Sequence, residues 1–266
     1  KSGFLMDISL AGKHALVCGS SRGIGRAIAM ELATAGATVT VVARSRPALE
    51  EVLRKLPRDQ EQPHELIVAD FSDPDLLEDR VRVLVARRPV HILVNNTGGP
   101  PGGPAHAADS REYREAFTRH LICSQVLTSV VLPGMRNAGY GRIINLISTS
   151  VKQPIQGLGV SNTVRGAVAN WAKTLASELG PEQITVNNVL PGFTDTDRLA
   201  SLIRARANAT DQSVQEVTDS MRRNIPLRRI ADPSEIANAV AFLASPAASY
   251  INGINLPVDG GMVLSL

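Results

Sequence analysis

The residues best suited to chemistry in this chain are three glycines in a short turn near its beginning. Gly19, Gly23 and Gly25 stand in the spacing Gly-x-x-x-Gly-x-Gly, directly after the apolar run Leu16-Val17-Cys18. Glycine permits positive φ and lets a ligand approach the backbone closely. Apolar side chains at helical spacing follow the turn, so it opens a helix whose free N–H groups and positive dipole end suit a pyrophosphate. The turn therefore predicts a dinucleotide-binding site.

Charges after the second expected strand, at 38–43, predict which cofactor binds. In NAD-binding chains an acidic residue about 20 positions past the glycines binds the ribose 2′-hydroxyl. This chain has no acidic residue between Glu31 and Glu50. It has Arg44 at the end of the strand and Arg22 inside the turn instead. Guanidinium groups suit a 2′-phosphate, so NADP(H) is favoured over NAD(H); the alternative is that both arginines are solvated surface residues.

These residues must be positioned by a chain in which strands and helices alternate. Strands are expected at 16–18, 38–43, 65–69, 92–94, 142–147, 184–190 and 254–258. The alternation predicts an α/β protein with a doubly wound parallel sheet, a Rossmann fold, forming a single domain over residues 1–266 with its crevice at the carboxyl ends of the strands. Residues 195–224 are polar and helix-prone, without one strong apolar stripe, and are predicted to form a small helical substrate lid.

Composition excludes several other classes of function. The chain of 266 residues is 44% hydrophobic and can bury one sizeable core. Its 28 basic and 25 acidic residues are interspersed, so no nucleic-acid surface is expected. Cys18 and Cys123 lack metal-ligand spacing, which predicts no metal, no disulfide and a reducing, cytoplasmic location. No apolar run is long enough to span a membrane, and Met6 is expected to be the native start.

Several motifs in consistent order resemble the classical short-chain dehydrogenases/reductases, in the branch of β-ketoacyl-(acyl carrier protein) reductase-like enzymes. The resemblance covers essentially all of Leu10 to Met262 and includes Asn95-Asn96-Thr97-Gly98 and Val258-Asp259-Gly260-Gly261. It implies a small-molecule substrate, an adenine contact at Asp70, and a homotetramer or dimer built on long helices. The cofactor site that it implies, together with the arginines above, consists of Gly19, Ser21, Arg22, Gly23, Ile24, Gly25, Arg44, Asp70, Phe71, Asn95, Thr97, Gly98, Pro191, Gly192, Thr194 and Thr196.

The resemblance weakens at the residues that catalyse the reaction in this family. There a Tyr-x-x-x-Lys pair follows an active-site serine by 13 residues, and an asparagine in the preceding long helix completes a tetrad. Ser148 matches the serine, but the same count places Ser161 at the tyrosine and Arg165 at the lysine. Aligning the helix that contains Phe117 places His120 at the asparagine. Only Ser148 keeps the residue type that the family uses.

Two hypotheses follow. In the first, the protein is an NADP(H)-dependent oxidoreductase of carbonyl or alcohol substrates, similar to 3-oxoacyl reductases. Ser148 and Ser161 then hydrogen-bond the carbonyl, and Arg165 stabilises developing negative charge. His120, with a reference pKa of about 6.5, supplies the proton through water, unless it is a structural histidine bonded to backbone. In the second, the protein keeps its nucleotide site but has lost dehydrogenase activity, and serves in binding, assembly or non-redox chemistry. Retention of the whole cofactor site favours the first.

Overall fold

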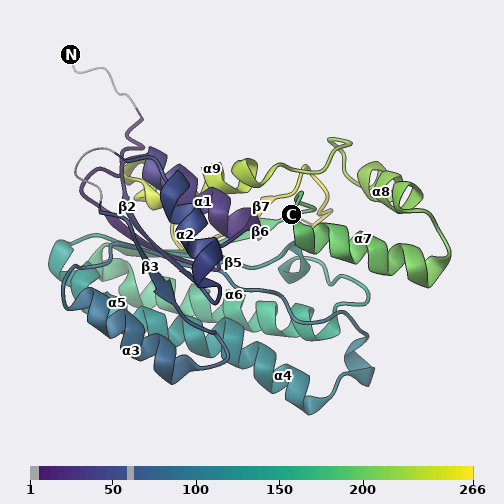
Figure 1. Ribbon diagram of the computed structural model, residues 1–266, viewed down its shortest axis with the longest axis horizontal. Coiled ribbons are helices and arrows are strands. Elements are labelled where there is room, and N and C mark those ends of the chain that lie inside the picture. Colours follow the sequence, from purple (N-terminus) through teal and green to yellow (C-terminus); the bar gives the residue numbers. More distant parts are fainter. Residues whose placement is uncertain (1–5, 59–62, 266) are drawn as a thin grey trace.

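A parallel sheet forms the centre of the structure, with strands in the order β3-β2-β1-β4-β5-β6-β7 (Figure 1). The computed structural model describes residues 6–58 and 63–265, so the segment that precedes the expected start at Met6 lies outside the described residues. Every pair of neighbouring strands is parallel, which confirms the predicted doubly wound sheet. The strands are β1 (His14–Cys18), β2 (Thr38–Ala43), β3 (Glu65–Val68), β4 (Ile92–Asn95), β5 (Gly141–Leu146), β6 (Ile184–Pro191) and β7 (Asn255–Val258).

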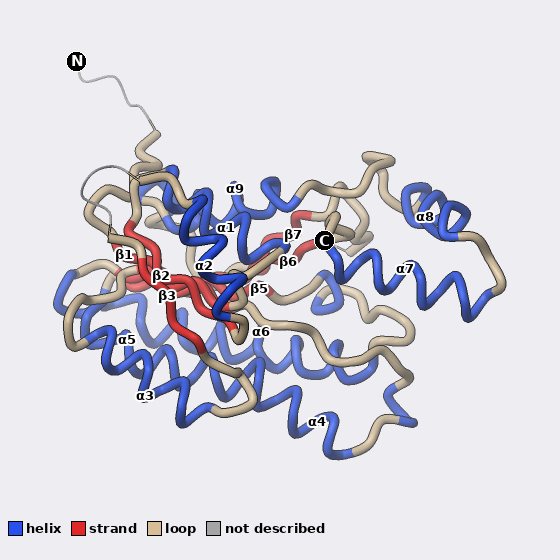
Figure 2. The backbone as a smooth tube through the Cα atoms, viewed as in Figure 1, coloured by secondary structure: helices blue, strands red, loops and turns tan. Residues whose placement is uncertain are grey.

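Helices cover both faces of the sheet (Figure 2). In Figure 1, α1, α2 and α9 lie on one side, whereas α3, α4, α5 and α6 lie on the other. The order of strands reverses between β1 and β4, and in such sheets the ligand crevice opens at this point. The helices are α1 (Gly23–Thr34), α2 (Arg46–Lys55), α3 (Pro74–Val85), α4 (Ser110–Phe117), α5 (Cys123–Ala138), α6 (Gly159–Leu179), α7 (Asp197–Thr210), α8 (Val214–Arg223) and α9 (Pro233–Ala244).

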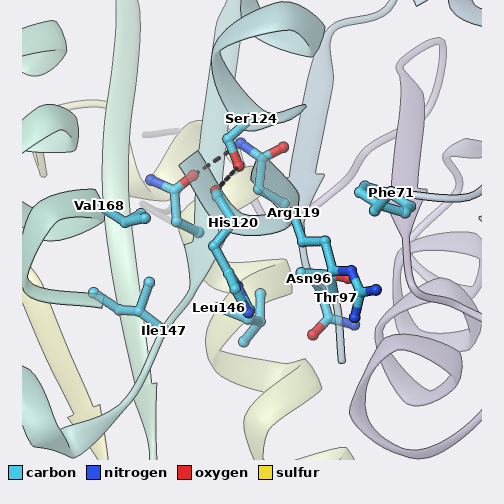
Figure 3. Close-up of a pocket in the computed structure, with 11 residues that line it drawn as sticks. Phe71, Asn96, Thr97, Arg119, His120, Ser124, Leu146, Ile147 and Val168 are labelled. Atoms are coloured by element: carbon cyan, nitrogen blue, oxygen red, sulfur yellow. Dashed lines mark hydrogen bonds between the residues drawn. The ribbon is translucent and has the colours of Figure 1, made fainter. Parts of the chain in front are cut away.

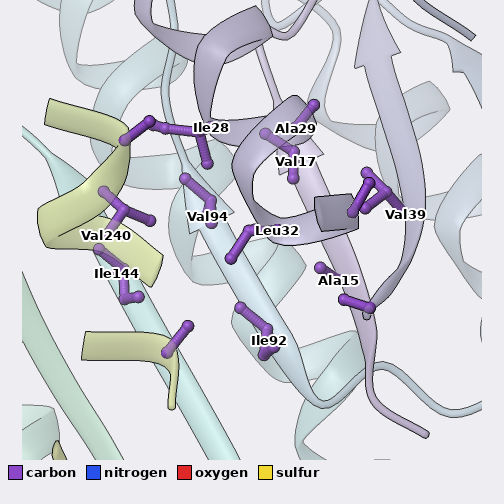
Figure 4. Packing of buried hydrophobic residues seen from close by; sticks show 14 of the residues in the cluster. Ala15, Val17, Ile28, Ala29, Leu32, Val39, Ile92, Val94, Ile144 and Val240 are labelled. Carbon is purple, nitrogen blue, oxygen red and sulfur yellow. The ribbon is translucent and has the colours of Figure 1, made fainter. Parts of the chain in front are cut away.

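Apolar side chains from α1 and α9 pack on one face of the sheet (Figure 4). Ile28 and Leu32 of α1 lie beside Val240 of α9 over the buried β1 and β4 residues Val17 and Val94. Burying a side chain of this size contributes about 1.5–3 kcal/mol. The start of α1 is therefore held firmly against the carboxyl ends of β1 and β4, where the glycine turn lies.

The helical segment that contains Phe117 is divided by a π-helical turn. The turn covers Thr118–Ile122 between α4 and α5. A π-helical turn adds a residue to the helix and changes which side chains face inward, and such turns are frequent at functional sites. Here His120 is buried while Ile122 is exposed. The alignment that placed His120 from the helix containing Phe117 did not include this interruption.

The predicted lid consists of α7 and α8, which extend beyond the carboxyl end of the sheet (Figure 1). The absence of a strong apolar stripe, expected from the sequence, is wrong for α7. Leu199, Ile203 and Ala207 lie one turn apart on α7 and bury against Val217 and Met221 of α8. This small cluster is separate from the cores of the sheet, so the lid has packing of its own.

Cys18 and Cys123 are both buried and free. Among the described residues, no group of three or more His, Cys, Asp or Glu side chains is placed to hold a metal ion. Within the same part of the chain, no helix combines the length and apolar composition that crossing a membrane requires.

A buried histidine, His14 at the start of β1, connects three segments at the end of the sheet where the strands begin. Nε2 of His14 lies 2.8 Å from Oγ1 of Thr40, and Nδ1 lies 3.0 Å from the carbonyl oxygen of Pro89. The side chain is only 2% exposed, and burial lowers its pKa to about 4. The folded protein therefore favours the neutral imidazole over a wide pH range.

We expect His14 to make the protein sensitive to acid. Its folded pKa of about 4 lies below the unfolded value of 6.5, so its stabilising contribution is complete above pH 6.5 and is lost as the pH falls towards 4. The loss amounts to about 3 kcal/mol of unfolding free energy. Urea unfolding at pH 7 and pH 4.5 should show a smaller difference for His14→Gln than for the unmodified protein. Parallel pH profiles would contradict the assignment.

Candidate active site

The glycine turn has the geometry of a phosphate cradle, although its three glycines are required for different reasons. Gly19 and Gly23 have φ of +59° and +54°, in the left-handed region that favours glycine. Gly25 is helical and has no positive φ, so it is required for lack of space and not for its backbone conformation. A Cβ at Gly25 would lie 2.2 Å from the carbonyl oxygen of Gly19, so this position has no room for a side chain.

Two polar residues that the sequence analysis did not include hold this turn. The side-chain nitrogen Nδ2 of Asn96 donates to the backbone carbonyls of Cys18 (3.2 Å) and Gly19 (3.3 Å). The buried Oγ of Ser20 accepts a hydrogen bond of 2.9 Å from the backbone N–H of Val42 on β2. Neighbouring side chains along a strand point to opposite faces, so only one residue of the Asn95-Asn96 pair can face the turn. That alternation is the signal that could have identified Asn96.

We expect Gly25→Ala to remove the cofactor site. Its methyl group would collide with the Gly19 carbonyl at 2.2 Å, and overpacking of this kind costs about 1–3 kcal/mol. Gly166→Ala on α6 is the matched control, because a Cβ there meets nothing within 4 Å and alanine favours a helix. Fluorescence titration with NADPH and thermal unfolding should show weaker binding and lower stability for the first variant only. Equal behaviour of the two variants would exclude this role for Gly25.

The two predicted 2′-phosphate arginines lie on the rim of the turn and are exposed. Nη1 of Arg22 lies 3.7 Å from a carboxylate oxygen of Asp197 at the start of α7. Nη1 of Arg44 lies 3.9 Å from a carboxylate oxygen of Asp70. Exposed ion pairs of this kind contribute about 0–1 kcal/mol, so an incoming phosphate competes with them easily. The structure thus brings Asp70, the expected adenine contact, next to Arg44.

The other predicted cofactor residues form the walls around the turn. Thr194 donates to the carbonyl of Gly192 at 3.1 Å just beyond β6, and Thr196 caps α7 by accepting from the N–H of Leu199 at 3.3 Å. A Cβ at Gly23 would lie 3.2 Å from Cγ2 of Thr196, so the end of β6 and the glycine turn face each other. Pro191 ends β6, and Ser21 and Ile24 belong to the turn and the start of α1.

Asn95, a predicted cofactor residue, is the first member of a row of hydrogen-bonded asparagines. Its side chain is buried, and its amide donates to Oδ1 of Asn145 at 2.9 Å. Asn145 donates to Asn188 at 2.9 Å, and Asn188 donates to Asn255 at 2.8 Å. These four residues are direct partners in the register of β4, β5, β6 and β7. We call them the asparagine row. Its signal in the sequence is an asparagine in each of four strands, whose alignment depends on the register.

Arg165 contacts Ser161 and the backbone directly before Ser148, at the carboxyl end of β5. Nε of Arg165 donates to Oγ of the buried Ser161 at 3.2 Å. Its Nη1 donates to the carbonyls of Leu146 (3.1 Å) and Ile147 (2.8 Å), directly before Ser148. Burial lowers the pKa of Arg165 to about 10, and the charge of Arg198 adds to this effect, yet the group stays positive at neutral pH.

The hydroxyl groups of this cluster keep their own protons available. Oγ of Ser148 accepts from the N–H of Ser150 at 3.1 Å, and Oγ of Ser161 accepts from Arg165 at 3.2 Å. A hydroxyl that accepts one hydrogen bond still has a proton to donate. The cluster therefore offers two hydroxyl donors beside one fixed positive charge, which suits an oxygen that gains negative charge.

His120 lies next to this region. Burial, followed by the charges of Arg165 and Arg119, lowers its pKa to about 3, while the carbonyl of Gly98 opposes the shift. This low pKa favours the neutral imidazole at physiological pH, which agrees with the alternative of a structural histidine. Its role as a proton donor stays a prediction. Its ring atom Nε2 is buried without a partner among the described side chains and backbone.

A pocket lies between His120 and the residues Asn96 and Thr97 that follow β4 (Figure 3). It brings together Phe71, Asn95, Thr97 and His120 from the predicted set, and adds Arg119, which the sequence analysis did not include. Ser148, Ser161 and Arg165 are not among its lining residues. Arg165 is connected to the pocket through its wall, which includes Leu146 and Ile147, the two residues whose carbonyls accept from Arg165. Its complete lining is Phe71, Asn95, Asn96, Thr97, Arg119, His120, Ser124, Asn145, Leu146, Ile147 and Val168.

None of the three tyrosines replaces the missing phenol. Tyr140 donates to the carbonyl of Ala244, and its ring is packed between Lys13 and Arg142. Tyr250 is fully exposed. The hydroxyl of Tyr113 is 3.5 Å from the carbonyl of Ala105. The site therefore relies on hydroxyl and guanidinium groups.

Known proteins resemble this chain along nearly its whole length. The family described as enoyl-(acyl carrier protein) reductase matches residues 19–263. The 3-oxoacyl-(acyl-carrier-protein) reductase of Pseudomonas aeruginosa is 34% identical over 97% of this chain and 100% of its own length. The 7alpha-hydroxysteroid dehydrogenase of Escherichia coli K12 is 31% identical over 98% of both chains.

A solved structure is similar in fold as well. The L-sorbose reductase of Gluconobacter frateurii, complexed with NADPH and L-sorbose, superposes with a TM-score of 0.89 at 30% identity, over 98% of this chain and 100% of its own. The parallel sheet, the glycine turn and these matches lead to one conclusion. The chain belongs to the short-chain dehydrogenase/reductase family, in its ketoacyl reductase-like branch.

Proposed function

We propose that this protein is an NADP(H)-dependent oxidoreductase that interconverts a carbonyl and an alcohol. The observation that carries the proposal is the cluster of Ser148, Ser161 and Arg165 at the carboxyl end of β5. It places hydroxyl donors and a positive charge where a carbonyl oxygen would need them, in a chain that keeps a complete phosphate cradle. Relatives named as a 3-oxoacyl reductase and a hydroxysteroid dehydrogenase, both oxidoreductases of this kind, support the reaction type.

The residues present fit the cofactor. Side chains at Gly19 and Gly25 would fill the cradle, since each Cβ would meet backbone or Asn96 within 3 Å. Arg22 and Arg44 place two exposed guanidinium groups at the rim, which supports a 2′-phosphate and hence NADP(H). The L-sorbose reductase, complexed with NADPH, supports the same preference. When bound, the cofactor supplies the hydride.

Residues of the chain then bind and protonate the carbonyl oxygen of the substrate. Ser148 and Ser161 donate hydrogen bonds to the substrate oxygen, and Arg165 stabilises the negative charge that develops on it. The positive charge of Arg165 also favours the deprotonated form of the Ser161 hydroxyl that it contacts. We therefore assign Ser161 as the immediate proton donor, and water then returns a proton to it. His120 stays neutral and shapes the neighbouring pocket.

We also propose a cytoplasmic homotetramer or homodimer. Two free buried cysteines agree with a reducing compartment. Sedimentation velocity separates the three assembly states, since a monomer sediments at the 28.3 kDa of one chain.

The cofactor preference can be measured directly. We expect NADPH to bind at least tenfold more tightly than NADH, and Arg44→Ala to remove most of that difference, because a charge-assisted hydrogen bond is worth about 1.5–3 kcal/mol. Arg46→Ala is the matched control, since Arg46 is a nearby exposed arginine that pairs with Glu50 on its own helix. Titration followed by nucleotide fluorescence reports all the affinities. Failure to bind either cofactor would overturn the proposal.

Turnover tests the reaction itself. NADPH oxidation should be screened over ketones, quinones and acyl thioesters. We expect Ser161→Ala to lower kcat at least tenfold, because it removes the proton donor, with no change in NADPH affinity. Ser177→Ala, which replaces an exposed serine on the same helix, should leave kcat unchanged. Tight NADPH binding without turnover on any class would favour the second hypothesis, a cofactor-binding protein without dehydrogenase activity.

A further inference from the structure

Arg165 has one end of its guanidinium group unused. Its Nε and Nη1 atoms bind Ser161, Leu146 and Ile147, and all three acceptors are neutral. Over residues 6–58 and 63–265, no carboxylate lies within ion-pair distance of it. The remaining nitrogen, Nη2, lies 3.6 Å from the place where a Cβ on Gly99 would be.

A second guanidinium group approaches the same point from the lid. Arg198, in the first turn of α7, places its own Nη2 3.8 Å from the Cβ position of Gly99. It donates to the carbonyl of Pro100 at 2.9 Å, and within the described part of the chain it also lacks a carboxylate partner. Two positive groups thus converge on one residue without a side chain.

An anion between the two groups would stabilise such a pair, and because Arg198 is exposed an anion can reach it from solvent. Like charges at short range repel, and the charge of Arg198 is one of the causes that lower the pKa of Arg165. Guanidinium groups form their strongest hydrogen bonds with carboxylates and phosphates. His120, being neutral, adds no competing positive charge.

We propose that Arg165 and Arg198 bind the carboxylate of an anionic substrate, so that the protein acts on a short oxo acid or hydroxy acid. This rests on the proposed function. Arg165 contacts Ser161 directly, so the carboxylate lies close to the carbonyl that Ser161 hydrogen-bonds. Arg165 is fixed to β5, whereas Arg198 belongs to the lid, so the anion joins the lid to the sheet. Arg198 is a specificity-determining residue in this scheme.

Malonate and its neutral amide, malonamide, test the site without turnover. Calorimetric titration of the NADPH-bound protein should show malonate binding at least tenfold more tightly than malonamide. Arg198→Met should abolish that difference, because it keeps the length of the side chain and removes the charge. Arg204→Met, on an exposed arginine of the same helix, should bind both probes as the unmodified protein does. Equal binding of the two probes to the unmodified protein would overturn the proposal.

Further measurements separate this inference from its alternatives. If Arg198→Met weakens NADPH binding as strongly as malonate binding, then Arg198 holds the cofactor phosphates and the proposal fails. With acetoacetate and its methyl ester as substrates, we expect the acid to be preferred at least tenfold in kcat/KM. Arg198→Met should remove that preference by raising KM for the acid only. Specific malonate binding without oxidation of NADPH by any carbonyl compound would support the anion site and refute the proposed function.

Discussion

The site depends on one close approach of backbone to backbone. Gly25 lies so near the carbonyl of Gly19 that no side chain fits between them, and the amide of Asn96 binds that same carbonyl from β4. This contact fixes α1, the glycine turn and the loop after β4 relative to one another. The apolar packing of α1 and α9 on the sheet then makes the arrangement rigid. Arg22 belongs to this turn, and Gly23 of the turn faces Thr196 at the start of α7, so the rim and the predicted lid meet here.

The fold was largely predictable because its signals are local and repeated. Apolar runs, glycine turns and capping residues occur in the order that a doubly wound sheet requires, and the strand bounds agree within two residues. The π-helical turn at Thr118–Ile122 could not be predicted, because it continues a helical pattern with only a small local change. The stripe of Leu199, Ile203 and Ala207 was hidden by the polar residues around it.

The candidate site was predictable in its positions but not in its chemistry. Counting along the chain found Ser161 and Arg165, which the structure joins by a hydrogen bond. It could not show that His120 is buried beside two arginines, where burial and charge suppress its protonation. The contacts of Asn96 with the glycine turn and of Arg198 with the loop after β4 depend on which loops lie together in the folded protein. The spacing of these residues in the sequence does not indicate such contacts. Protonation and pairing are tertiary properties, whereas residue identity is local.

The asparagine row gives the sheet a polarity across its strands. Each amide donates towards β7, so the side-chain dipoles from Asn95 to Asn255 all point the same way. Hydrogen bonds in such a chain strengthen one another, and no single amide can be reversed without reversing the rest. The row therefore behaves as a short electric dipole lying across the strands. Its negative end is the side-chain oxygen of Asn95, which has no hydrogen-bond partner among the described residues and lies in the pocket beside His120. The sheet therefore places a partial negative charge at this pocket.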